Sequence, residues 1–183
     1  ALFFSANGMS SLIQAFNTSY HIRENKSIIG HQILSIVLTV ILSLLVFLTI
    51  ILIIFGKGTI LYLIEYQIIS ENKILLLNSA KWVILITMLF VGITTLFNFG
   101  PAIKSKIKIF SPAAILTTLF IIITSIAFSY YIDNFSQYNK IYGSIGTLII
   151  ILLWIYFNAI ILLTGFELDA SIYNAKKKIK NKI

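Results

Sequence analysis

Four long apolar runs constrain the fold of this chain more than any other feature of its sequence. They cover residues 33–55, 82–99, 112–132 and 146–166, and none contains a charged side chain. A helix of about 20 apolar residues crosses the hydrocarbon core of a bilayer, which is about 30 Å thick. Because lipid satisfies no backbone hydrogen bonds, only helices or closed barrels span it, and these runs are too long for barrel strands. The sequence therefore predicts an all-α, polytopic integral membrane helix bundle.

Composition supports a membrane protein. The 183 residues are 58% hydrophobic and 11% charged, whereas a soluble domain carries about 25% charged residues. Too few polar side chains remain to cover a surface in water, so lipid must face most of it. The formal net charge of +8 fits the cytoplasmic loops of a membrane protein better than a nucleic-acid site, and we expect no nucleic-acid partner. The sequence has no cysteine, which excludes disulfides and thiolate catalysis.

Helix-boundary residues flank two of the runs. The second run stops at Gly100 and Pro101, because proline cannot continue a helix. Ser111 is a suitable N-cap for the third run, and Pro112 suits its first helical position. Between the first two runs, residues 60–69 (ILYLIEYQII) predict a further interfacial or extracytoplasmic helix.

Lysine and arginine are unevenly divided between the two sides of the predicted spans. Ten lie on one side: Arg23, Lys26, Lys104, Lys106, Lys108, Lys176, Lys177, Lys178, Lys180 and Lys182. Four lie on the other: Lys57, Lys73, Lys81 and Lys140. Basic residues accumulate on the cytoplasmic side, so we predict a cytoplasmic C-terminus. We also expect six of them to contact anionic lipid headgroups, namely Lys104, Lys106, Lys108, Lys176, Lys177 and Lys178.

The first twenty residues carry a polar stripe. Its members recur at spacings of three and four, which places them on one helical face: Asn7, Ser10, Ser11, Gln14 and Asn17. An interfacial helix would have this pattern, and so would the inner half of a spanning helix whose polar face lines a bundle. We favour the spanning helix, because the alternation of sides requires Arg23 to be cytoplasmic. The chain starts within an apolar run, so we expect four complete transmembrane helices plus a partial N-terminal one.

The last third of the chain carries a distinctive set of motifs, within residues 134–170 (NFSQYNKIYGSIGTLIIILLWIYFNAIILLTGFELDA). It resembles the YihY/BrkB family of bacterial inner-membrane proteins, which shows these residues: Asn134, Phe135, Tyr138, Asn139, Lys140, Tyr142, Gly143, Ser144, Gly146, Leu153, Trp154, Tyr156, Gly165, Phe166, Glu167 and Leu168. The resemblance implies a six-helix bundle with both termini cytoplasmic. It implies one transmembrane domain over residues 1–183, truncated at its N-terminus. It also marks a family-motif loop formed by Tyr138, Asn139, Tyr142, Gly143 and Gly146.

A small set of polar side chains lies in or near the predicted helices. Asn158, Gly165 and Asp169 share one face at 100° per residue, which favours helix–helix packing over ligand contact. Glu167 lies near the opposite face. It either pairs with Lys176 or Lys177 in headgroup water, or faces a cytoplasmic cavity and pairs with Arg23 or Lys26. The candidate cavity or packing residues are Asn7, Gln14, Asn17, Asn158, Glu167 and Asp169.

Hydroxyl side chains form two further stripes, Ser35, Thr39 and Ser43 in the first run and Thr118, Ser125 and Ser129 in the third. Such stripes are typical of packing faces, and they can also line a narrow polar path. Either role fits a bundle of membrane helices.

The function expected from the sequence is transport. The resembled family once carried the label of a tRNA-processing ribonuclease, but the chain has two histidines, His21 and His31, with no adjacent acidic motif. We therefore expect no catalytic residues, cofactor or metal. A multi-helix bundle with polar faces favours a transporter or exporter of a lipid or another small amphipathic envelope molecule. The alternative is a membrane scaffold that recruits envelope partners.

Overall fold

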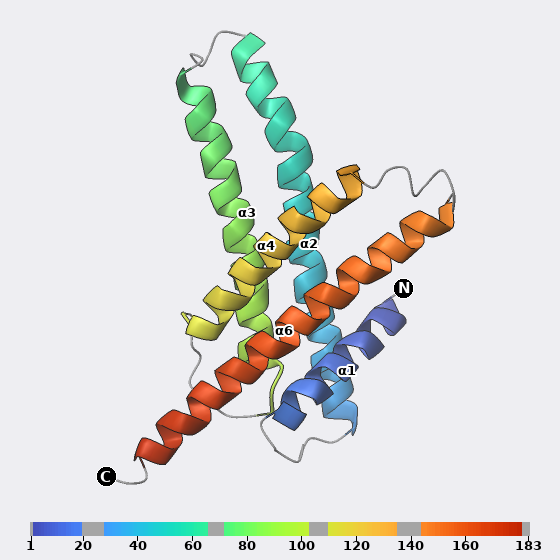
Figure 1. Cartoon of the computed structure of the whole chain (residues 1–183), viewed down its shortest axis with the longest axis vertical. Coiled ribbons are helices and arrows are strands. Elements are labelled where there is room, and N and C mark those ends of the chain that lie inside the picture. The colour runs from blue at the N-terminus through green and yellow to red at the C-terminus, as the bar shows by residue number, and fades with distance from the viewer. Residues whose placement is uncertain (1, 20–27, 66–71, 103–109, 135–143, 181–183) are drawn as a thin grey trace. The chain divides into compact units, whose positions relative to one another are not determined.

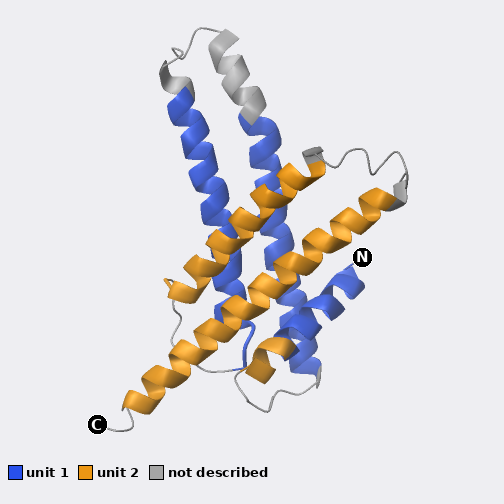
Figure 2. Cartoon of the chain, in the orientation of Figure 1, with its two compact units in different colours: residues 1–14, 24–103 blue, residues 15–23, 104–183 orange. Residues whose placement is uncertain are grey.

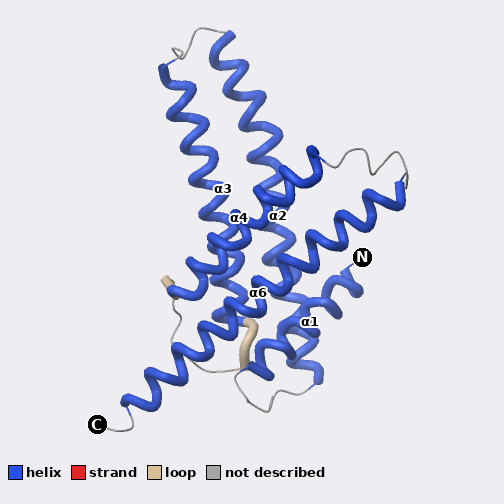
Figure 3. Tube along the Cα trace, in the orientation of Figure 1, coloured by secondary structure: helices blue, strands red, loops and turns tan. Residues whose placement is uncertain are grey.

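The computed structural model describes residues 2–19, 28–65, 72–102, 110–134 and 144–180. Within these ranges the chain forms helices and no strands (Figures 1 and 3). The helices are α1 (Leu2–Ser19), α2 (Ile28–Glu65), α3 (Asn72–Phe99), α4 (Pro112–Asn134) and α6 (Ser144–Lys180). The prediction of an all-α fold is confirmed.

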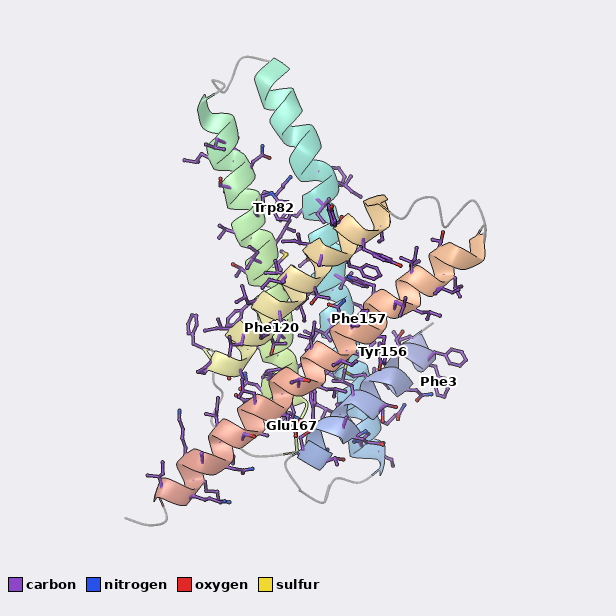
Figure 4. The ribbon with its side chains drawn as sticks, in the orientation of Figure 1. Phe3, Trp82, Phe120, Tyr156, Phe157 and Glu167 are labelled. Carbon is purple, nitrogen blue, oxygen red and sulfur yellow. The ribbon has the colours of Figure 1, made fainter. Side chains whose placement is uncertain are left out.

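Four of the helices are long and apolar enough to cross a membrane: Ile29–Gly56, Leu75–Phe99, Pro112–Ile132 and Gly146–Ile179. Each contains one of the four predicted runs, and Pro112–Ile132 has the predicted bounds. Their outer surfaces carry large apolar side chains, of which Trp82, Phe120 and Phe157 are 61%, 54% and 44% exposed (Figure 4). Lipid can cover such a surface at no cost in hydrophobic free energy.

The chain divides into two compact units (Figure 2). Residues 1–14 and 24–103 form unit 1, which holds α2, α3 and the first part of α1. Residues 15–23 and 104–183 form unit 2, which holds α4, α6 and the last turn of α1. The assignment of residues 1–183 to a single domain stays a prediction.

Two predicted helix boundaries are confirmed. The amide of Ile115 donates to the carbonyl of Ser111 at 3.1 Å, so Ser111 is the N-cap of α4 and Pro112 its first residue. At the end of α3, the amide of Gly100 donates to the carbonyl of Leu96 at 2.9 Å. Pro101 follows and cannot extend the helix.

Three helices are much longer than their predicted spans, and α3 begins at Asn72, ten residues before the predicted run. α2 continues to Glu65, so residues 60–65 belong to the first spanning helix and not to a separate one; residues 66–69 lie outside the described ranges. α6 continues to Lys180, which makes the lysine-rich segment helical. Lysine is a good helix former and its charge is favourable at a helix C-terminus.

In unit 1, α2 and α3 run antiparallel and side by side (Figure 1). Their contacts use long or flexible side chains. A Cβ placed on Gly92 would lie 3.6 Å from Leu42 and 3.8 Å from Leu45, which is ordinary van der Waals contact. The hydroxyl of Thr49 lies 3.4 Å from the sulfur of Met88.

In unit 2, α4 and α6 also run antiparallel (Figure 1). Their shared core is built from small residues, and Ala113, Ala114, Thr117 and Ala170 are all 2% exposed or less. Small residues allow the backbones of membrane helices to approach closely. A polar site lies in this interface.

Candidate functional site

A buried polar pair joins the start of α4 to α6. The Ser111 hydroxyl donates a hydrogen bond to Oδ1 of Asp169, and the two residues are 3% and 5% exposed. Because Ser111 is the N-cap of α4, this carboxyl group also lies at the positive end of that helix's dipole. The buried Asp169 side chain thus has polar neighbours from α4.

Tight packing surrounds the pair. Gly165 lies one turn before Asp169 on α6, and a Cβ at Gly165 would overlap the Thr117 hydroxyl and lie 2.9 Å from Thr117 Cβ. Phe166 is fully buried and stacks on Phe16, with ring centroids 3.8 Å apart. The sequence places Gly165 and Asp169 on one face of α6, and in the structure both turn toward α4.

The other acidic residue of the motif behaves differently. Glu167 is exposed on α6 (Figure 4), and within the described residues no ion pair links it to Lys176 or Lys177. Arg23 and Lys26, the partners of the cavity alternative, lie outside the described ranges. The role of Glu167 therefore stays a prediction. The buried acid of this segment is Asp169.

Asn158 lies in the middle of the α6 span. Its amide donates to the Trp154 carbonyl at 2.7 Å, one turn earlier on the same helix. This bond uses one of the two N–H groups of the amide and stays within α6, so the predicted role of Asn158 between helices stays a prediction.

The polar stripe of α1 is divided. Asn7 and Gln14 are exposed, whereas Asn17 is 5% exposed. Ser10 turns toward α2, where its hydroxyl lies 2.7 Å from Nε2 of His31. The buried face of α1 is mostly apolar: Ala6, Ile13 and Phe16. A cavity role for Asn7 and Gln14 stays a prediction.

A groove of about 450 Å³ lies between α1 and α2 in unit 1. Its walls are mainly apolar with three hydroxyl side chains: Ser5, Met9, Thr39, Leu42, Ser43, Val46, Phe47 and Ile50. Its volume falls within the range of small-molecule sites, and its lining is mostly apolar. A second groove, of about 290 Å³, lies between α4 and α6 in unit 2.

The remaining predicted site residues divide into two sets. Gly146 is buried near the start of α6, and Lys176, Lys177 and Lys178 are exposed near its end. The others lie outside the described residues: Tyr138, Asn139, Tyr142, Gly143, Lys104, Lys106 and Lys108.

Metal chemistry has no visible basis in the described part of the chain. There, no group of three or more His, Asp or Glu side chains could hold a metal ion. The hydrogen bond of the buried pair joins a hydroxyl group to a carboxyl group. The site is suited to packing and binding.

These features define a polytopic α-helical membrane protein. The chain belongs to the virulence factor BrkB family, whose sequence profile matches residues 1–182. This match confirms the resemblance found in the motifs of residues 134–170.

Curated relatives agree with this assignment. The chain is 28% identical over 177 residues to the ribonuclease-like protein YfkH of Bacillus subtilis (strain 168), covering 97% of this chain and 64% of YfkH. It is 34% identical over 82 residues to a UPF0761 membrane protein of Pseudoalteromonas translucida (strain TAC 125), covering 45% of this chain and 27% of that protein. A UPF0761 membrane protein of Haemophilus influenzae (strain PittEE) is 33% identical over 87 residues, which is 48% of this chain and 32% of the relative. No solved structure matches the chain.

Proposed function

We propose that this protein is an inner-membrane transporter or exporter for a lipid or another small amphipathic molecule of the bacterial envelope. The observation that carries the proposal is the groove between α1 and α2, together with a polar stripe that runs into it. An amphipathic molecule needs a polar surface and an apolar surface. Its polar end loses hydrogen bonds to water within a membrane and must find new partners, whereas its apolar chain needs only apolar contact.

The polar stripe lies along α2. His31, Ser35, Thr39 and Ser43 recur every four residues and extend over about 18 Å of helix. The hydroxyls of Ser35 and Thr39 donate to carbonyls one turn earlier, at 3.0 and 2.7 Å. Each hydroxyl oxygen can still accept a hydrogen bond. Ser35 is fully buried, so Thr39 and Ser43, which line the groove, are the members that offer acceptors to a polar group.

The groove provides the apolar half of such a site. Thr39 and Ser43 lie where the stripe enters it, and Val46, Phe47 and Ile50 continue it along α2. All these residues belong to a helix long and apolar enough to cross a membrane. Lipids are the most abundant amphipathic molecules at that depth.

The proposed location is the bacterial inner membrane with the C-terminus in the cytoplasm. Support comes from the ten-to-four distribution of basic residues between the two sides. The relatives named as membrane proteins belong to bacteria. We also propose that anionic lipid headgroups contact the cytoplasmic lysines.

A ribonuclease activity is not proposed. The name of YfkH describes that protein as ribonuclease-like. The described residues of this chain hold no cluster of three metal-ligating side chains, which a metal-dependent nuclease requires.

The proposal is tested by lipid movement between leaflets. The full-length protein is reconstituted into vesicles that contain a fluorescent phospholipid, and the rate at which the inner-leaflet label becomes accessible to a membrane-impermeant quencher is measured. Wild-type protein should raise this rate above that of empty vesicles. Ser43→Leu and Thr39→Val should each lower the gain about five-fold, as expected for the loss of one hydrogen-bonding group.

Thr95→Val is the matched control, because the Thr95 hydroxyl also donates to a carbonyl one turn earlier and lies outside the groove. It should leave the rate unchanged. A wild-type rate equal to that of empty vesicles, across zwitterionic and anionic lipids, would favour the scaffold alternative and reject transport of phospholipids.

A further inference from the structure

The polar stripe of α2 is accessible at its two ends and covered between them. His31 lies two residues after Ile29, where the α2 span begins, a rise of about 3 Å, and it is half-buried. Ser43, at the other end, is exposed in the groove. Between these ends Ser35 is fully buried and Thr39 is 7% exposed. Within the described residues, a polar group therefore has no open route along the stripe from the headgroup region to the groove.

Helix α1 covers the middle of the stripe. Its Ser10 shares a hydrogen bond with His31, in which Oγ and Nε2 are 2.7 Å apart. One residue earlier, Met9 lines the groove together with Thr39. Helix α1 therefore lies against α2 both before and after Ser35 (Figure 1).

The apolar part of the groove is open. Val46, Phe47 and Ile50 are exposed, so a hydrocarbon chain can reach them from the surrounding lipid. A polar group cannot follow that path without losing its hydrogen-bonding partners. The two ends of an amphipathic molecule thus have different access to the groove, and only the polar end depends on α1.

The hydrogen bond between α1 and α2 is suited to opening. Ser10 and His31 are both half-buried, and they lie close to the headgroup region, where water can replace either partner. Breaking such a bond changes an equilibrium by only about five-fold. The bond between Ser111 and Asp169 has no such replacement at hand, because both residues are buried.

We infer that α1 is a gate between the headgroup region and the groove, and that the hydrogen bond between Ser10 and His31 holds this gate closed. The arrangement in the structure is the closed one. When the bond breaks, the part of α1 that belongs to unit 1 moves away from α2 and uncovers Ser35 and Thr39. The polar end of an amphipathic molecule then moves along the stripe while its chain remains in the groove. The gate rests on the proposed function, since it controls access to the same groove.

Cysteine labelling tests the gate without any transport. The 183 residues contain no cysteine, so Ser35→Cys in the full chain gives a nearly isosteric reporter at the covered part of the stripe. The protein is placed in nanodiscs, and its rate of reaction with a charged, membrane-impermeant thiol reagent is measured. This rate follows the fraction of molecules in which α1 has opened. Ser10→Ala should raise it about five-fold, the effect expected for the loss of one net hydrogen bond.

A second variant and two controls locate the effect. His31→Phe keeps an aromatic ring without a hydrogen-bonding group and should raise the rate by the same factor. Combined with Ser10→Ala it should add little, because both variants lose the same bond. Ser11→Ala is the matched control and should leave the rate unchanged, because the Ser11 hydroxyl donates to the Asn7 carbonyl within α1 at 3.2 Å. Thr117→Cys, a buried reporter in unit 2, should label at the same rate with and without Ser10→Ala.

Two results would overturn the gate. One is a labelling rate of Ser35→Cys that stays the same in Ser10→Ala and in His31→Phe. The other is an equal rise at Thr117→Cys, because the variant would then loosen the whole protein. Faster labelling of Ser35→Cys in a protein that moves no lipid would support the opening of α1 and reject the transport proposal alone. Lipid movement with unchanged labelling would reject the gate alone.

Discussion

The two antiparallel helix pairs of this protein are held together in different ways. Between α4 and α6 the contact is close, with small buried residues, a glycine that a threonine side chain covers, and a buried hydrogen bond between Ser111 and Asp169. Between α2 and α3 the glycine contacts are ordinary and the neighbours are leucine, methionine and lysine side chains. A further groove of about 300 Å³ lies along α2 and α3.

The difference concerns how uniquely each pair is specified. Lipid chains are as apolar as leucine, so apolar contact alone gives membrane helices little reason to prefer one arrangement. Close backbone approach and a directed hydrogen bond form only when the two helices are aligned in one register. We therefore expect α4 and α6 to have a single packed arrangement, and α2 and α3 to tolerate adjustment.

Replacing one interface glycine in each helix pair with alanine should give the largest difference in stability between the two pairs. Gly165→Ala places a Cβ against Thr117, whose hydroxyl is held by the Ala113 carbonyl at 2.7 Å. The free energy of unfolding, measured for full-length protein in mixed micelles, should fall by about 2 kcal/mol, as expected for an overpacked core. Gly92→Ala should change it by less than about 0.5 kcal/mol, because its new methyl group meets only flexible leucine side chains.

A partial rescue checks the cause. Thr117→Ala removes the hydroxyl and methyl groups that a Cβ at residue 165 would meet, so it should restore part of the stability of Gly165→Ala. Equal losses for Gly165→Ala and Gly92→Ala would contradict the distinction between the two pairs.

The buried hydrogen bond should give the next largest effect. Asp169→Ala and Ser111→Ala each break it and leave one polar group buried, at a cost of about 1.5 kcal/mol in unfolding free energy. Because both variants lose the same bond, the double variant should cost less than the sum of the two.

Two controls accompany this cycle. Glu167→Ala lies two residues from Asp169 on the same helix and removes an exposed acid, so it should leave stability unchanged. Thr49→Val removes the hydroxyl next to Met88 in the α2–α3 pair, and it should cost less than Asp169→Ala. If Glu167→Ala lowered the free energy of unfolding as much as Asp169→Ala, Asp169 would not be the acid that stabilises the interface.

The smallest effect on stability is expected from the lysines at the end of α6. Changing Lys176, Lys177 and Lys178 to Gln should leave unfolding unchanged, because all three are exposed. Binding to nanodiscs of anionic lipid should weaken, since each basic residue near an anionic surface contributes about 1 kcal/mol before screening by salt. A reporter at the C-terminus should show a modest rise in misoriented protein. Tight binding of structured RNA by the wild type at physiological salt, lost in the Gln variant, would contradict the membrane-surface interpretation.

The sequence predicted most of the fold. Uncharged apolar runs predicted four membrane-spanning helices, and Ser111, Pro112 and Pro101 predicted helix boundaries that the structure confirms. Helix ends that are not marked by a strong helix-breaking residue such as proline were predicted less well. Gly56 does not stop α2, which continues to Glu65, and the lysines after residue 175 continue α6. Glycine in a helix costs only about 1 kcal/mol, and tertiary contacts override that cost.

The candidate site was predicted only in part. Motif resemblance marked the segment from Gly165 to Leu168, and periodicity placed Asp169 on the face of Gly165. Its partner Ser111 is 58 residues away, and a single sequence carries no signal for such a contact. The stack of Phe16 on Phe166 and the contact of Ser10 with His31 were missed for the same reason. Helical periodicity predicts which residues share a face of one helix, but it does not identify the helix that packs against that face.

The length of α6 has a mechanical consequence. Its 37 residues form a rod of about 55 Å, well beyond the thickness of a bilayer core. Gly165 contacts α4 part way along this rod, and Lys180 lies 15 residues further on, an arm of about 22 Å. With Gly165 as the fulcrum, a tilt of about 10° would move the lysine-bearing end by about 4 Å. Under the proposed contact of these lysines with anionic lipids, a force on that end would act as a torque on the contact between Gly165 and Thr117.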